Sequence, residues 1–247
     1  MFYYMNPFLY IVAIIPGAYL LWYVYKQDRI EPEPRPLLVK LFILGIVSTS
    51  LAAFTEGIGS VVLGVLFGGD ESGVIFRFLM YFIVVALSEE GFKYLLLKRG
   101  SWNHPAFDYQ FDGIVYAVFV SLGFAIKENI MYVTSYGLAT GIVRAFTAVP
   151  GHASFGIMMG AWYGMAKKYE FLDPQKSKTY LKRALWIPVF LHGLYDFAAS
   201  SESEMSVIAF FVIVIIMFIL CYNIVKVISR NDAPINSDPD FQYRDIQ

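Results

Sequence analysis

Charged side chains are scarce in this sequence: Asp, Glu, Lys and Arg make up 16% of its 247 residues, against about 25% in soluble domains. A chain that is 57% hydrophobic cannot hide its side chains in one water-soluble core, so the lipid bilayer is its natural solvent. Cysteine occurs once, at Cys221, which excludes an internal disulfide bond. The net charge of -1 gives no sign of nucleic-acid binding, and we expect none.

Lys and Arg are absent from residues 1–6, so the N-terminus lacks the basic region of a cleavable signal peptide. We therefore expect the first apolar run to be a retained helix. Alternation between apolar and polar residues, which is typical of transmembrane barrels, is also missing from the apolar runs.

Seven apolar runs are long enough to cross a bilayer as helices, since a span needs about 20 residues. They are residues 7–25, 37–67, 73–97, 111–136, 138–166, 180–199 and 205–228. The second run is overlong, and we expect Glu56, Gly57 and Gly59 to end or bend it, leaving an interfacial or re-entrant piece. The predicted fold is an all-α, polytopic transmembrane helical bundle.

Lys and Arg are concentrated in alternate loops, which indicates the side of the membrane on which each loop lies. They flank the first, third and fifth loops and the C-terminal end, whereas the other loops hold Asp70, Glu71, Glu202 and Glu204. Because basic loops stay in the cytoplasm, we predict a multi-pass protein of the cell membrane with its N-terminus outside and its C-terminus in the cytoplasm.

The remaining segments are short and polar. Alternate prolines in 31–36 forbid a helix and predict an extended linker. Residues 231–247 are polar and predict a disordered cytoplasmic tail. Because we find neither an internal repeat nor a second soluble segment, we predict a single transmembrane domain over residues 1–230.

Several ionisable residues fall inside the predicted spans, where each costs roughly 2.5–3.5 kcal/mol near the bilayer centre. Glu89, Glu128, His152 and His192 belong to four different runs. At a rise of about 1.5 Å per residue, all of them lie within about 6 Å of the middle of their spans. Separate helices therefore bring acidic or imidazole groups to a similar depth, which indicates one shared site.

The sequence around these residues gives local pairings. Glu89 and Lys93 are four residues apart and share a helix face, whereas Glu90 points about 100° away and is expected to lack such a partner. His192 and Asp196 are likewise one turn apart on one face.

His152 begins a ridge of small residues at Gly156, Gly160 and Gly164, which recur every four residues. Such ridges let helix backbones approach closely, so His152 is expected to face the bundle interior. Pro150 is expected to kink the helix beside it.

Two histidines and a carboxylate are a common zinc-binding set that leaves one position open for water. Bound zinc lowers the pKa of that water to about 7, and a further carboxylate nearby can act as general base. Asp196 can orient His192 or ligate directly. Because no HExxH motif is present, the chain does not have a zincin helix. These ligands also allow iron or manganese.

Each residue also has a purely structural interpretation. The alternatives are a neutralised pair for Glu89 and Lys93, a packed histidine bonded to a carbonyl for His152, a hydrogen-bonded pair for His192 and Asp196, and a buried ion pair of Glu128 with Lys127 or Arg144. None of these alternatives explains why ionisable residues, which are unfavourable inside a membrane, lie at a similar depth in four different spans.

Several segments, taken in order, resemble the PrsW family of membrane-embedded proteases. They are residues 28–34 (DRIEPEP), 89–93 (EEGFK), 111–116 (FDGIVY), 123–129 (GFAIKEN), 150–152 (PGH) and 192–196 (HGLYD). More distantly, the chain is similar to CAAX prenyl endopeptidases and bacteriocin-processing membrane proteases. The resemblance extends from about residue 20 to about residue 200.

The resemblance implies hydrolysis of a peptide bond in or near the membrane-spanning part of a substrate protein. The founding member of the family cuts a membrane-anchored anti-sigma factor to start a stress response. The positions that match the family's functional residues are Glu89, Glu90, Glu128, His152, His192 and Asp196. Relatives in the wider superfamily carry histidine at the position of Glu128.

Our leading hypothesis is that Glu89 or Glu90 activates water. Glu128, His152 and His192 would hold a metal, with zinc expected, or otherwise stabilise the oxyanion. The main alternative is a proton-coupled transporter or channel, because buried Glu, His and Lys residues also form relays. A third is a binding or scaffold protein that keeps the fold without the chemistry. The partners expected are a membrane-anchored protein substrate and the lipid bilayer.

Overall fold

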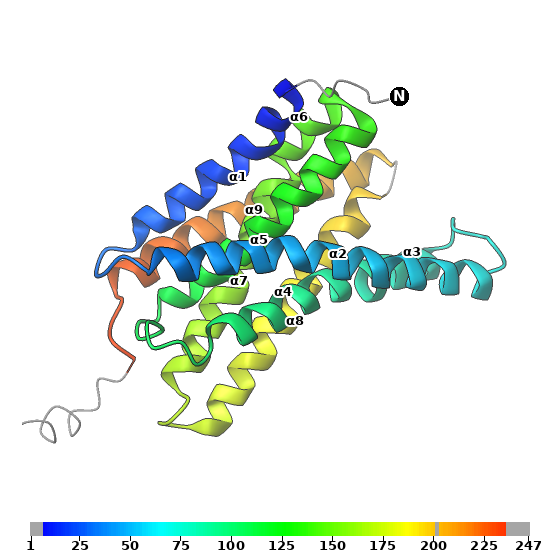
Figure 1. Cartoon of the computed structure of the whole chain (residues 1–247). Coiled ribbons are helices and arrows are strands. Elements are labelled where there is room, and N and C mark those ends of the chain that lie inside the picture. The colour runs from blue at the N-terminus through cyan, green and yellow to red at the C-terminus, as the bar shows by residue number, and fades with distance from the viewer. Residues whose placement is uncertain (1–6, 201–202, 236–247) are drawn as a thin grey trace, which may run out of the picture.

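The computed structural model describes residues 7–200 and 203–235, and these residues form a bundle of helices without a β-strand (Figure 1). The elements are α1 (Pro7–Gln27), α2 (Arg35–Leu66), α3 (Val74–Phe78), η1 (Leu79–Ala86), α4 (Leu87–Ser101), α5 (Asp112–Tyr136), α6 (Leu138–Phe146), α7 (Ala148–Lys168), α8 (Pro174–Ala199) and α9 (Glu204–Arg230). The prediction of an all-α membrane bundle is confirmed, since every apolar run coincides with one helix or with consecutive helices.

The predicted break in the second apolar run is wrong, because α2 continues without interruption past Glu56 to Leu66. In lipid each backbone N–H and C=O must be bonded within its own helix, which favours continuation. The chain turns instead at Gly68 and Gly69, whose φ angles are 61° and 82°. The N–H of Gly69 donates to the carbonyl of Gly64 at 2.9 Å, the bond that closes a Schellman motif.

The fifth apolar run forms two helices in place of the single span expected. The helix α6 ends at Phe146 and α7 begins at Ala148. Pro150 explains the break, because its ring clashes with the carbonyl four residues earlier and it has no N–H to bond there. The proline therefore lies in the first turn of α7, so it separates two helices where the sequence predicted a kink. The boundary expected between the fourth and fifth runs is confirmed at Gly137, where φ is 86°.

The helix α5 lies at the centre of the bundle, with α1, α2 and α7 packed around it (Figure 1). The contact with α7 uses the predicted ridge of small residues. A Cβ atom added to Gly156 would lie 2.8 Å from the Ser121 Cβ, and one added to Gly113 would lie 2.6 Å from the Gly164 backbone N. The two backbones can approach this closely only because glycine lacks a Cβ.

Four of the described helices, α1, α2, α5 and α9, are both long and apolar enough to cross a membrane. The most apolar window of α5 is 72% buried inside the protein, whereas that of α9 is only 17% buried. The α9 side chains Ile208, Phe211 and Ile215 are more than half exposed, as expected for a helix that contacts lipid. The count of seven spans and the orientation of the termini stay predictions.

The polar segments flank one end of the bundle. Residues 28–34 are non-helical as expected, but α2 already begins at Arg35 with Pro36 in its first turn, where proline is tolerated. Residues 231–235 follow α9, and the N–H of Ile235 donates to the carbonyl of Asp108 at 2.6 Å. The rest of the predicted disordered tail lies outside the described residues.

Candidate active site

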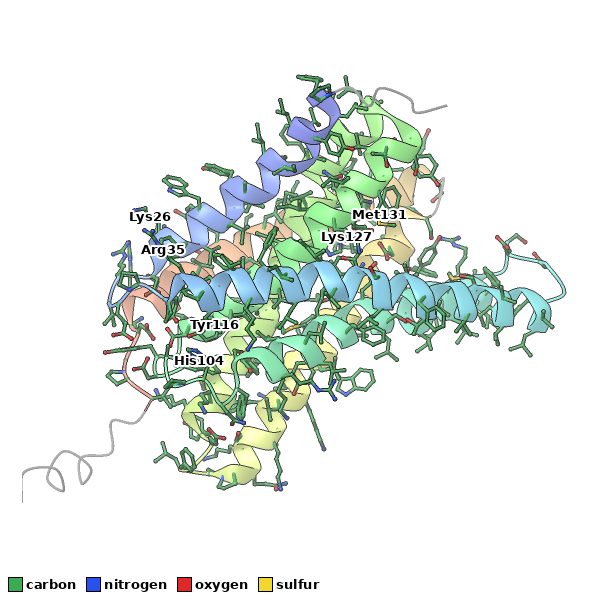
Figure 2. All side chains as sticks on the ribbon, viewed as in Figure 1. Lys26, Arg35, His104, Tyr116, Lys127 and Met131 are labelled. Carbon is green, nitrogen blue, oxygen red and sulfur yellow. The ribbon has the colours of Figure 1, made fainter. Side chains whose placement is uncertain are left out.

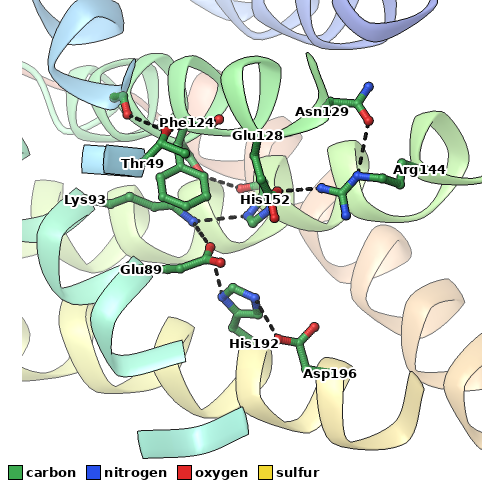
Figure 3. Close-up of polar contacts among 12 residues, drawn as sticks. Thr49, Glu89, Lys93, Phe124, Glu128, Asn129, Arg144, His152, His192 and Asp196 are labelled. Carbon is green, nitrogen blue, oxygen red and sulfur yellow. Dashed lines mark hydrogen bonds and ion pairs between the residues drawn. The ribbon is translucent and has the colours of Figure 1, made fainter. Parts of the chain in front are cut away.

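Four helices bring the predicted site residues together in the interior (Figure 3). The set consists of Glu89, Glu90 and Lys93 from α4, Glu128 from α5, His152 from α7, and His192 and Asp196 from α8. Glu89, Glu90, Lys93 and both histidines are buried. The shared depth expected from the sequence thus corresponds to one cluster.

The ammonium group of Lys93 lies at the centre of this cluster. Its Nζ donates to Glu90 Oε1 at 2.8 Å and to Glu89 Oε2 at 3.1 Å, and it lies 3.1 Å from the His152 Nδ1. The expectation that Glu90 lacks a local partner is therefore wrong, because residues three apart on a helix are neighbours as well as residues four apart. Lys93 therefore forms ion pairs with both glutamates.

His192 lies between carboxylates on both sides of its ring. Its Nδ1 is 3.0 Å from Glu90 Oε1 and 3.9 Å from Glu89 Oε2, and its Nε2 is 3.3 Å from Asp196 Oδ2. The ring stacks on Phe155 at a centroid distance of 4.7 Å. Asp196 on one side and Phe155 on the face therefore fix the orientation of the imidazole.

His152 has the same arrangement, with Glu128 in the place of Asp196. The Nε2 of His152 lies 2.9 Å from Glu128 Oε2, while its Nδ1 faces Lys93. The same Glu128 oxygen accepts from Arg144 Nη2 at 2.5 Å. Both histidines thus direct Nδ1 toward the centre of the cluster and Nε2 toward an outer carboxylate.

Arg144 is the only one of the suggested basic partners that reaches Glu128 in the described structure. Its guanidinium also donates to Asn129 and lies 3.9 Å from the centre of the Tyr132 ring. Lys127 instead turns away and donates to the Ile46 carbonyl of α2 at 3.2 Å. The buried ion pair proposed for Glu128 therefore exists, with Arg144 as its partner.

A cavity of about 650 Å³ adjoins the cluster. The ionisable residues in its lining are Glu56, Glu89, Glu128, Arg144, His152, His192 and Asp196, together with Tyr81, Tyr132 and Tyr195. Glu90 is fully buried and does not line the cavity. Glu89 is thus the member of the glutamate pair that faces the space available to a substrate.

Glu56 is a lining residue that the sequence reasoning assigned to a helix end. Its Oε1 is buried and has no hydrogen-bond partner. The position of an acidic residue inside a long apolar run could have indicated a site residue, but the neighbouring glycines suggested a break in the helix. Since α2 is continuous, Glu56 belongs to the cavity.

Four donors of the cluster can hold a metal ion: ligating atoms of Glu89, Glu90, His152 and His192 all lie within 4.8 Å of one another. Glu128 is not in this group, although it bonds to one of its histidines. The Oε2 of Glu90 is buried and has no hydrogen-bond partner. Two imidazoles and carboxylates form a donor set that suits zinc.

A membrane helical bundle with paired glutamates, two histidines and an internal cavity is the architecture of a membrane-embedded hydrolase. Comparison with known proteins identifies the family within that class. The model of the PrsW family intramembrane metalloproteases matches residues 33–222. The chain belongs to this family, and it is a membrane-embedded protease.

Curated relatives support the same assignment. The chain is 34% identical over 212 residues to the protease PrsW of Oceanobacillus iheyensis, covering 86% of this chain and 92% of that protein. It is 34% identical over 184 residues to the protease PrsW of Geobacillus kaustophilus, covering 74% and 76%, and 34% identical over 192 residues to that of Bacillus subtilis, covering 78% and 83%. No solved structure matches the chain.

Proposed function

We propose that this protease hydrolyses a peptide bond in or near the membrane-spanning part of its substrate, with Glu89 as the general base. The observation that carries the assignment is that Glu89 lines the cavity whereas Glu90 does not. A base must come within hydrogen-bonding reach of the attacking water, and only a cavity-lining group can do so. Glu90 bonds to Lys93 and His192, which suits a positioning residue.

In the proposed reaction the Glu89 carboxylate removes a proton from water as the water oxygen bonds to the substrate carbonyl carbon. The carbonyl π electrons move to its oxygen, which becomes an oxyanion that the imidazole groups lining the cavity stabilise. Glu89 then gives the proton to the amide nitrogen, the oxyanion electrons re-form the C=O bond, and the C–N electron pair leaves with the nitrogen. The amine product leaves and the carboxylate is restored.

The donors present fit a zinc ion, which would be held by His152, His192 and Glu90. When bound, zinc polarises the substrate carbonyl and lowers the pKa of a bound water to about 7. Glu128 and Asp196 accept from the outer nitrogens of the two histidines, as carboxylates behind metal-binding histidines do. We therefore assign Glu128 to orienting His152, in place of the ligand role expected from the sequence.

The position of Lys93 restricts metal binding at this site. Its ammonium group contacts three of the four donor residues. A divalent ion and the Lys93 charge would compete for the same donors, so zinc binding requires Lys93 to move away from them. If Lys93 stays, glutamate and histidine perform the hydrolysis without metal on the same residues.

The proposed substrate is a membrane-anchored regulatory protein such as an anti-sigma factor. This part of the proposal rests on the family, whose founding member cuts a protein of that kind. Membership of an intramembrane protease family supports it, since enzyme and substrate would meet in the bilayer.

Reconstitution tests the proposed activity. Purified parent protein is incorporated into liposomes with single-span membrane proteins from the host, and new N-termini are mapped by mass spectrometry. We expect cuts in or beside the spans with the parent and with the exposed-loop control Glu71→Gln, and none with Glu89→Gln. Cuts that persist in Glu89→Gln would overturn the assignment of the base, and their absence from the parent would overturn the proposed function.

A further inference from the structure

A second group of acids lies away from the active site, where the connection between α1 and α2 meets the start of α5. One carboxylate oxygen from each of Asp28, Glu33 and Asp112 lies within 4.8 Å of the others. Glu33 is 3% exposed and Asp112 1% exposed. Glu33 bonds to Tyr116, which Figure 2 shows at the same end of the bundle as Lys26 and Arg35.

This acid group lacks a compensating positive charge. None of the Lys and Arg residues that the structure describes forms an ion pair with Asp28, Glu33 or Asp112, whereas Lys93 and Arg144 compensate the acids of the active site. Burial raises the pKa of Glu33 to about 7. Burial, together with the neighbouring Asp232, also raises the pKa of Asp28 to about 6.

Two carboxylate oxygens of this group receive no hydrogen bond from a donor outside it. The Oε1 of Glu33 and the Oδ2 of Asp28 are buried and accept no hydrogen bond. The other Glu33 oxygen accepts from the Tyr116 hydroxyl, and Asp112 Oδ2 accepts from the N–H of Tyr109 at 2.7 Å. These bonds hold the carboxylates in position while leaving oxygens free for a ligand.

We propose that Asp28, Glu33 and Asp112 bind a hard divalent cation, Ca²⁺ or Mg²⁺, that fastens the α1–α2 connection to the start of α5. All the donors are oxygens, which these cations prefer and which distinguishes this site from the histidine-containing group in the active site. Oxygens no farther apart than 4.8 Å can share one Ca²⁺ ion, whose oxygen ligands lie at about 2.3–2.6 Å.

The cation would also stabilise the segment after α9. Asp232 accepts from the N–H of Phe111, next to Asp112, at 3.0 Å, and Ile235 bonds to the Asp108 carbonyl. Three segments far apart in the sequence therefore meet around the acids: the α1–α2 connection, the loop before α5, and residues 231–235. One ion at this point would hold the first two directly, and the hydrogen bonds of Asp232 and Ile235 attach the third to the loop that the ion fastens.

The test uses the full-length protein in detergent after treatment with a chelator. Calcium and magnesium binding are measured separately by isothermal titration, and thermal unfolding is followed with each ion added. We expect about one ion per chain and a higher unfolding temperature in the parent and in Asp70→Asn, an acid in an exposed loop. Glu33→Gln and Asp28→Asn should each lose binding by at least tenfold and lose the temperature shift.

Two further results separate this site from the active site and from a shared proton. His192→Ala should keep calcium or magnesium binding unchanged, because it removes a donor only from the active-site group. If the parent binds neither ion at millimolar concentration, and Glu33→Gln raises the unfolding temperature, then the acids share protons and the proposal is overturned. Binding that survives in both Glu33→Gln and Asp28→Asn would overturn it as well.

Discussion

The ammonium group of Lys93 lies among three of the four donor residues that a metal ion would use. It also lies 3.8 Å from the centre of the Phe124 ring. Its ion pairs with Glu89 and Glu90 offset part of the cost of burying carboxylates inside the membrane. Lys93 and Arg144 thus place positive charge among the acids of the active site, which distinguishes it from the second acid group.

Glu128→Gln and His152→Ala distinguish an orienting residue from a ligand. If Glu128 only orients His152, we expect Glu128→Gln to weaken zinc binding and turnover by about 10–100-fold, while His152→Ala abolishes both. The measurement is zinc per chain after titration, together with the rate of substrate cleavage. Equal loss of zinc in both variants would restore the ligand role that the sequence suggested for Glu128.

The sequence predicted most of the residues that gather in the candidate site, because burying an ionisable group in a membrane span is unfavourable whatever the fold. It could not identify their roles, which depend on contacts between helices. The role proposed for Glu128 rests on its contact with His152 of α7, and the central place of Lys93 follows from the approach of the same helix. Glu56 was misassigned because its glycine neighbours suggested a helix end.

At the level of elements, the contact between α5 and α7 positions Glu128 against His152. Gly156, Gly160 and Gly164 let the two backbones approach, and Gly113 of α5 faces the last of these. The four-residue spacing predicted a close approach of another helix at this face, but not that the partner would be α5. The spacing is informative because a row of small residues on one face of an apolar helix is typical of close contact with another helix.

Gly160→Ala tests this contact. A Cβ at Gly160 would press on the backbone of Gly113 and Ile114, so we expect a loss of about 1–3 kcal/mol in the free energy of unfolding, with loss of cleavage. Gly57→Ala on α2 is the matched control, since nothing lies within 4 Å of its added Cβ. Unfolding in detergent is the measurement, and equal stability of the two variants would contradict the close contact.

The π-helical segment η1 was not foreseen. It runs over Leu79–Ala86 within a continuous helical stretch from Val74 to Ser101 and directly precedes the turn that carries Glu89. A π-helix changes the direction, around the helix axis, in which the residues after it point. Such segments often occur at functional sites. The apolar sequence of this segment, LMYFIVVA, contains no signal that distinguishes it from an α-helix.

At the level of the whole molecule, composition predicted the fold class and the apolar runs predicted the helices to within a few residues. Apolarity alone could not locate the break at Thr147 or the continuation of α2. Both depend on local backbone bonding: a proline ring in the first case and lipid surroundings in the second.

Single cysteines test the predicted orientation. Cys221 is buried, so the parent should react little with a membrane-impermeant maleimide. In intact cells we expect Ser72→Cys, in the loop after α2, to be labelled, and Gln175→Cys, at the start of α8, to be labelled only after the membrane is permeabilised. The physical reason is the basic charge around the second position. Labelling of Gln175→Cys in intact cells would reverse the topology.

The helices that carry the two histidines, α7 and α8, are not among those apolar enough to be recognised as spans by their own composition. During synthesis they would enter the bilayer poorly alone, since the insertion machinery partitions each segment largely by its apolarity. We therefore expect their insertion to depend on helices already present, above all α5, against which α7 packs through its glycines. We therefore expect the two histidines to reach the candidate site only after the more apolar helices have formed a frame in the lipid that can receive them.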